Sequence, residues 1–132
     1  MRITGEMGNL AAWEKRLFYM CSARPTLHPR ALFSDVTSDY RNPAEPVPGD
    51  EVTIRLRTGR YNVDKAYLVV DNVEHVMTRV RSESMFDYYE AKINVGTDKI
   101  YYYFKVELGR TVCYYNQIGA IKDLNPYYNF QI

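Results

Sequence analysis

Apolar and polar side chains alternate with a period of two along most of the chain. This period is typical of β-strands that bury one face and expose the other. In the segment 52–58, the side chains on the apolar side are Val52, Ile54 and Leu56. The segment 99–108 shows the alternation most clearly, and we expect it to form a long strand with one buried face.

Three aromatic residues fall on the apolar side of this pattern, and we expect Tyr89, Tyr102 and Phe104 in the core. No segment after the first 20 or so residues has a convincing helical period. The pattern therefore predicts an all-β fold, an immunoglobulin-like antiparallel β-sandwich. Further strands are expected at 65–70, 74–80, 86–93 and 111–115, with turns at 58–62, 71–72 and 109–110.

The beginning of the chain is organised differently. Five of the six prolines lie in 25–48, and proline denies a donor to a β-ladder, so we expect a loop-rich lead-in with at most an edge strand at 31–33. The segment 10–20 could form one short amphipathic helix. We therefore divide the chain into an N-terminal appendage, 1–24, helical or disordered, and a β-sandwich domain, 25–132.

Charge and hydropathy exclude several classes of partner. The 17 Lys and Arg residues against 16 Asp and Glu give a net charge of +1, so no global field favours nucleic acid or an anionic membrane. No stretch approaches the roughly 20 apolar residues that span a bilayer. Residues 1–20 contain no continuous apolar stretch of signal-peptide length, so we expect a cytoplasmic protein.

The residues that could support catalysis or bind a metal do not form a convincing constellation. His28 and His75 lack the spacing from cysteines or carboxylates that a zinc site needs. Asp87 lies on a strand, which supplies no cleft for a pair of catalytic acids. We expect no catalytic residue, no metal and no cofactor. Whether Cys21 and Cys113 form a disulfide stays open, with two free thiols favoured.

Several segments carry a resemblance to a known family. The segment 52–58 ends in Leu-Arg-Thr, 85–93 contains Phe-Asp-Tyr-Tyr, and 100–116 contains a Tyr-Tyr-Phe strand with its hairpin partner. In this order they resemble the N-terminal domain of neopullulanases, cyclomaltodextrinases and maltogenic amylases, which is carbohydrate-binding module family 34. Tyr89 stands where that family often has tryptophan, and His28-Pro29-Arg30 resembles an early His-Arg-Pro element with two residues exchanged.

The resemblance covers roughly residues 25–132 and implies a non-catalytic role. In the family, a catalytic (β/α)₈ barrel follows this domain, and such a barrel needs about 250 residues of its own. The resemblance implies a module that binds α-glucan, such as starch, a maltooligosaccharide or a cyclodextrin, beside a barrel that cleaves α-1,4 or α-1,6 glucosidic bonds. It also implies an alternative, in which the domain forms a homodimer and shapes the neighbouring active-site cleft without binding sugar.

Sugar-binding surfaces hold the apolar face of a sugar on exposed aromatic rings rimmed by polar groups. By alternation, Tyr88, Tyr101 and Tyr103 project from polar strand faces. If their two strands are neighbours, the three rings form one aromatic strip; the alternative is that they only pack against each other or against the second sheet. The candidate carbohydrate-binding residues are Tyr88, Tyr101, Tyr103, Arg55 and Arg57, with Lys92 and Lys105 around them.

Overall fold

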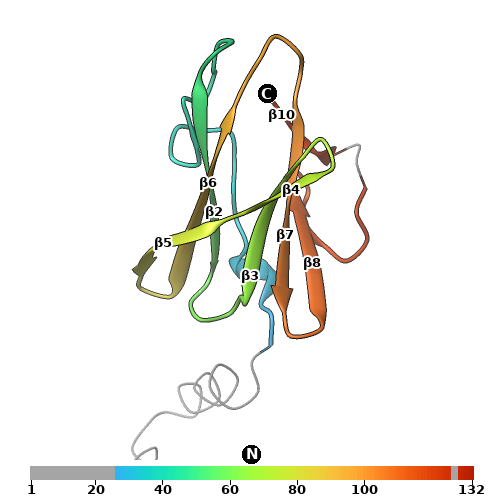
Figure 1. Ribbon diagram of the computed structural model, residues 1–132. Helices are drawn as coiled ribbons and strands as arrows, with labels where there is room; N and C mark the ends of the chain where they lie inside the picture. Colours follow the sequence, from blue (N-terminus) through green and yellow to red (C-terminus); the bar gives the residue numbers. More distant parts are fainter. Residues whose placement is uncertain (1–25, 126–127) are drawn as a thin grey trace, which may run out of the picture.

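Two antiparallel β-sheets pack face to face in residues 26–125 and 128–132, which the computed structural model describes (Figure 1). The predicted all-β sandwich is confirmed. The appendage 1–24, with its helix at 10–20 and Cys21, lies outside the described residues.

The first sheet has four strands in the order β1-β2-β6-β5. Its centre is the long antiparallel pairing of β2 with β6, which places Ile54 opposite Ala91 and Arg55 opposite Glu90. Both central strands begin and end close to the predicted limits. The strands are β1 (Arg41–Asn42), β2 (Glu51–Gly59), β5 (Thr78–Glu83) and β6 (Phe86–Asn94).

The second sheet has the order β4-β3-β7-β8-β9, and β10 pairs with one end of β7. The predicted strands at 65–70, 99–108 and 111–115 correspond to β3, β7 and β8. The short strands β9 and β10 were not predicted. The bounds are β3 (Lys65–Val70), β4 (Val73–Val76), β7 (Tyr101–Leu108), β8 (Thr111–Asn116), β9 (Gly119–Ile121) and β10 (Phe130–Gln131).

The core lies between the two sheets and contains the predicted aromatic residues. Tyr102 and Phe104 are completely buried, and Tyr89 is 8% exposed. The Tyr102 ring stacks on Phe130 with 5.1 Å between centroids, while the buried Arg41 donates a hydrogen bond to the Tyr102 hydroxyl. Burying an aromatic side chain of this size stabilises the fold by roughly 1.5–3 kcal/mol, so these rings anchor both sheets.

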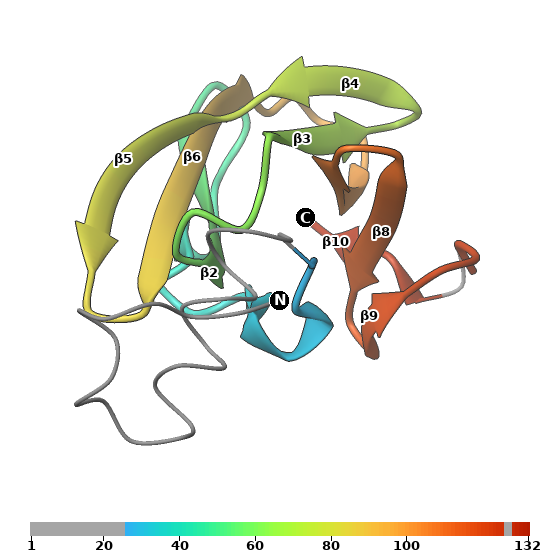
Figure 2. The same cartoon turned by 90° about the horizontal axis from the view of Figure 1, so that it is seen from below.

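The chain changes sheets between β4 and β5. The prediction of one strand at 74–80 is therefore wrong, because two short strands in different sheets occupy this segment. Met77 lies at the change, is buried, and donates its N–H to the Ala66 carbonyl oxygen at 2.9 Å. Figure 2 shows β4 and β5 running as one band along an edge of the sandwich. Every residue of β5 is exposed, so alternation could not reveal the break.

The proline-containing lead-in is loop-rich, as expected, but its edge strand lies elsewhere. Instead of a strand at 31–33, the chain forms a 3₁₀ turn, η2 (Pro29–Ala31), followed by a single bridge from Phe33 to Arg57. The edge strand is β1, which pairs with β2 and places Arg41 opposite Ile54. Proline sets the backbone angle φ that starts a helical turn, which favours η2 over a strand.

Candidate functional site

Tyr101 and Tyr103 lie on the outer face of the second sheet and line an open hollow of about 350 Å³. The Tyr101 side chain is 46% exposed, and Tyr103 is half-buried. We call this site the tyrosine hollow; it is lined by Asp71, Asn72, Tyr101, Tyr103 and Asn129. Its volume lies at the lower end of the roughly 300–1,000 Å³ typical of small-molecule sites.

A tight turn holds the polar wall of the tyrosine hollow. Asp71 and Asn72 join β3 to β4 with φ angles of 47° and 68°. Two-residue hairpins of this kind need positive φ at both positions, which Asp and Asn tolerate better than most residues. The Asp71 N–H donates to the Tyr101 carbonyl oxygen at 3.0 Å, and the Tyr101 N–H donates to Asp71 Oδ1 at 3.2 Å. The wall is therefore fixed to the strand that carries the tyrosines.

Tyr103 is supported from the side by a second tyrosine. Its ring meets Tyr114 of β8 edge-on, with 5.9 Å between centroids. Burial raises the pKa of the Tyr103 phenol, so the hydroxyl stays protonated at neutral pH. Val69, opposite Tyr103 on β3, is only 2% exposed although it belongs to the outer-facing set. The aromatic surface is thus well packed beneath and open above.

Asn129 forms the other side of the hollow. Its backbone carbonyl oxygen accepts a hydrogen bond from Gln117 Nε2 at 2.8 Å, and the next residue, Phe130, pairs with Tyr102. Its side-chain Oδ1 is buried and has no hydrogen-bond partner among the described residues. A buried acceptor without a donor is uncommon in folded proteins. Sequence analysis did not identify Asn129, because nothing in the local pattern places the end of the chain beside β7.

The other candidate carbohydrate-binding residues lie on the outer face of the first sheet, while Lys105, expected beside them, is on β7 of the second sheet and pairs with Glu74. Arg81 covers the Tyr88 ring at 4.5 Å from its centroid. Arg57 lies between two rings, 4.2 Å from the centroid of Phe86 and 5.2 Å from that of Phe33. The arginines on this face therefore cover aromatic rings that a sugar would need to reach.

Arg55 is also occupied by its neighbours. Its Nε and Nη2 both donate to Glu90 Oε2, at 2.9 and 2.7 Å, and Nη1 donates to the Asp39 carbonyl oxygen at 3.1 Å. This ion pair connects β2 to β6 and is partly exposed. Arg55 therefore belongs to the cross-strand framework of the first sheet.

The expected single aromatic strip does not form. Tyr88 is on β6, which pairs with β2 and β5, whereas Tyr101 and Tyr103 are on β7, which pairs with β3, β8 and β10. The two strands are in different sheets, so the condition for a single strip is not met. Alternation showed which side of its own sheet each ring occupies, but not which sheet each strand joins.

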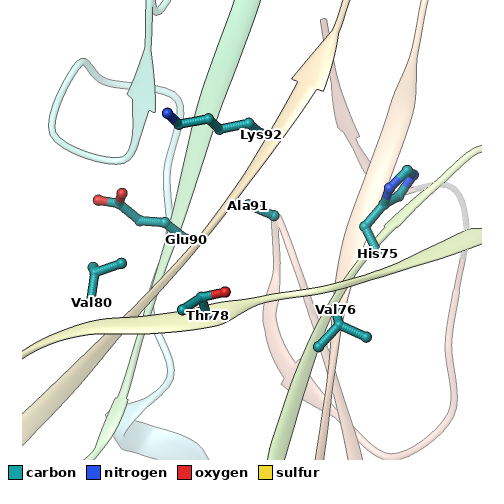
Figure 3. A pocket seen from close by; sticks show the side chains of 7 residues that line it. All are labelled: His75, Val76, Thr78, Val80, Glu90, Ala91 and Lys92. Carbon is teal, nitrogen blue, oxygen red and sulfur yellow. The ribbon is translucent and has the colours of Figure 1, made fainter.

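Two other hollows lack a comparable aromatic floor. Figure 3 shows one beside the β4–β5 crossover, where His75 and Lys92 lie on either side of Ala91. The residues that line this crossover hollow are His75, Val76, Thr78, Val80, Glu90, Ala91 and Lys92. The second, a polar hollow near β1, contains Tyr40 and the Arg55–Glu90 pair. Tyr40 is half-buried against Phe33, so it offers less open ring surface than Tyr101.

The groups considered for catalysis have structural contacts. The buried Asp87 carboxylate accepts hydrogen bonds from the Ser82 hydroxyl at 2.5 Å and the Tyr61 N–H at 3.0 Å. Cys113 is a free, buried thiol whose pKa burial raises. Among the described residues, no group of three or more His, Cys, Asp and Glu converges on a metal position. In this same part of the chain, no helix is long and apolar enough to cross a bilayer.

Comparisons with known proteins bear on this fold. The family described as alpha amylase, N-terminal ig-like domain matches residues 39–131. Among solved structures, the chain is similar to a cyclomaltodextrinase, with a TM-score of 0.64 and 18% identity over 78% of this chain and 19% of that one. No curated protein matches the sequence.

Two further solved structures share the fold. Maltogenic amylase from S. marinus has a TM-score of 0.62 and 12% identity, over 77% of this chain and 14% of that one. The type III pullulan hydrolase from Thermococcus kodakarensis has a TM-score of 0.52 and 19% identity, over 76% and 16%. This chain spans less than a fifth of each of the three.

Two antiparallel sheets around one apolar core define the class, an immunoglobulin-like β-sandwich domain. Because the family match covers most of its length, the chain belongs to the N-terminal Ig-like domains of α-amylases. In these enzymes the domain is the non-catalytic part, and the catalytic barrel lies elsewhere. The resemblance seen in the sequence is confirmed.

Proposed function

We propose that this chain is the α-glucan-binding module of an enzyme that cleaves α-1,4 or α-1,6 glucosidic bonds. The observation that carries the proposal is the tyrosine hollow, where two aromatic side chains meet three polar ones. Aromatic faces bind the apolar faces of sugars, and a few polar groups orient them. The names of the structural neighbours, which include a cyclomaltodextrinase and a pullulan hydrolase, support an α-glucan as the ligand.

The test is a titration of the 132-residue chain with maltooligosaccharide or β-cyclodextrin, followed by tyrosine fluorescence. We expect saturable quenching in the wild type. The double variant Tyr101→Ala/Tyr103→Ala should raise Kd by roughly fivefold or more, since each lost aromatic contact contributes about 0.5–1.5 kcal/mol. Tyr101→Ala alone should weaken binding with little change in thermal unfolding, because this ring is 46% exposed.

Tyr88→Ala provides the comparison on the opposite face. Its ring is covered by Arg81, so we expect sugar binding to be close to wild type. Loss of binding in Tyr88→Ala with retention in Tyr101→Ala would move the site to the first sheet. A wild-type chain that shows no saturable response to either sugar would contradict the proposed function itself.

The second candidate function is dimerisation. It is favoured by apolar side chains along the β4–β5 band, where Val76 is 71% and Val80 51% exposed. Exposed apolar patches on soluble proteins often mark contact surfaces. Under this alternative, size-exclusion chromatography of the chain shows a dimer, and Val76→Asp dissociates it. The proportion of dimer does not change when sugar is added.

A further inference from the structure

We infer that the tyrosine hollow selects its ligand by a hydroxyl group that donates a hydrogen bond to the side-chain oxygen of Asn129. This inference rests on the proposed function, because it places the sugar against Tyr101 and Tyr103. It adds a specificity-determining residue and the chemical class that the site accepts. The ligand is a neutral polyol whose hydroxyls are free to donate.

In the described part of the chain, the side chain of Asn129 has an unpaired hydrogen-bonding atom. Its Oδ1 is buried without a donor among the described residues, whereas its backbone oxygen is bonded to Gln117. Leaving a buried acceptor unpaired costs free energy that a well-placed donor recovers. Asn129 therefore holds an unused hydrogen-bonding capacity beside two aromatic rings.

The backbone of Asn129 is held in place, while its amide group is free to turn. Residues on both sides of the side chain fix its backbone, through the bond to Gln117 and the pairing of Phe130 with Tyr102. The terminal torsion of an asparagine is soft, so the amide turns without moving the backbone. Oδ1 is buried in the chain alone, so it meets a ligand only after such a turn; because Asn129 lines the tyrosine hollow, the turned amide lies beside the ligand.

The charge of the residues that line the tyrosine hollow also restricts the ligand. The five lining residues include the carboxylate of Asp71 but no lysine or arginine. An anionic ligand, such as a phosphorylated or sulfated glycan, meets this negative group, and the cation near Tyr103, Lys105, is already paired with Glu74 and Glu107. Asp71 and Asn129 both offer acceptor oxygens, which match hydroxyl donors. The hollow therefore suits an uncharged sugar with free hydroxyl groups.

The experiment measures the binding of two cyclodextrins to the wild type and to the variant Asn129→Leu. β-Cyclodextrin and permethylated β-cyclodextrin share apolar sugar faces, but only the first has hydroxyl donors. We expect the wild type to bind β-cyclodextrin at least tenfold more tightly than the permethylated form, and Asn129→Leu to reduce this preference about tenfold, as the loss of one hydrogen bond predicts. Differences in ligand shape affect the wild type and the variant alike. The change in the ratio of the two Kd values therefore isolates the hydrogen bond from the ligand hydroxyl to Asn129.

A matched control is Asn94→Leu, which alters an exposed asparagine on β6 and should keep the wild-type ratio. Thermal unfolding gives a second readout, because removing an unpaired buried acceptor should leave Tm unchanged or raise it. An unchanged ratio in Asn129→Leu, with binding still lost in Tyr101→Ala, overturns this inference and leaves the proposed function standing. If the wild type binds neither cyclodextrin, the result contradicts the proposed function, and this inference falls with it.

Discussion

The two outer faces of the sandwich differ in how far cations cover their aromatic side chains. On the first sheet, arginines cover the rings, as Arg57 does between Phe33 and Phe86 and Arg81 does over Tyr88. On the second sheet, Lys105 lies over Tyr67 at 4.8 Å from the ring centroid, but Tyr101 is 46% exposed and borders a hollow with polar walls.

The difference shows that exposure of an aromatic residue in a strand does not by itself indicate a ligand site. A guanidinium stacked on a ring stabilises the fold and also occupies the surface that a sugar would contact. On the second sheet, the open ring of Tyr101 lines the same hollow as Asn129, whose side-chain oxygen is buried and unpaired within the described part of the chain. Three measurements test whether the first sheet's outer face contributes to stability and the second sheet's outer face to sugar binding.

The largest effect is expected from alkaline pH, which acts on tyrosines of the core and of both outer faces. Burial raises the pKa of five tyrosines above 10.0, so in this range the folded chain binds more protons than the unfolded chain. Their contribution to stability is complete below pH 10.0 and is lost as the pH rises through the folded-state values. The five are Tyr40, Tyr89, Tyr102, Tyr103 and Tyr115.

Urea unfolding at increasing pH, with tyrosinate absorbance recorded in parallel, measures this loss. We expect the urea midpoint to fall steadily above pH 10.0, and both faces to be lost in one transition because they share the core. A midpoint that stays constant while these tyrosines ionise would contradict the role assigned to burial.

Asp87→Ala should have the next largest effect. It removes an acceptor shared by Ser82 and Tyr61 at the end of the first sheet, and each bond to a charged group is worth about 1.5–3 kcal/mol. We expect a loss of about 3 kcal/mol in the free energy of unfolding, measured with urea, and unchanged sugar affinity at the opposite face. Asp98→Ala, at an exposed aspartate, is the control and should cost little.

The smallest effect sharpens the comparison directly. Arg57→Ala removes two cation–π contacts and should cost about 1–2 kcal/mol of stability with no change in sugar affinity. Tyr101→Ala should do the reverse, weakening sugar binding while costing about 0.5 kcal/mol. If both variants change the same property, the two faces do not have separate roles.

Much of the fold could be predicted because the period of two reports directly on burial. The strands β2, β3, β6, β7 and β8 lie close to their predicted limits, and Tyr102 and Phe104 are in the core. The break at Met77 could not be predicted, since all of β5 is exposed and carries no alternation. The strands β1, β9 and β10 are too short for a period to be visible.

The candidate site was predicted only in part. Alternation placed Tyr101 and Tyr103 on an outer face, and the Asp71-Asn72 pair was recognised as a turn. The alternation could not show that this turn and Asn129 border the same hollow, because the hollow brings together residues that are far apart in the sequence.

The sequence by itself determined the class of fold, the inner and outer side of each long strand, and the resemblance to an amylase domain. These properties depend on neighbouring residues along one strand, and a local pattern is enough to specify them. The tertiary structure alone decided which strands share a sheet, and therefore that Tyr88 lies apart from Tyr101 and Tyr103. Strand pairing depends on contacts between distant segments, about which the alternation within a single strand carries no information.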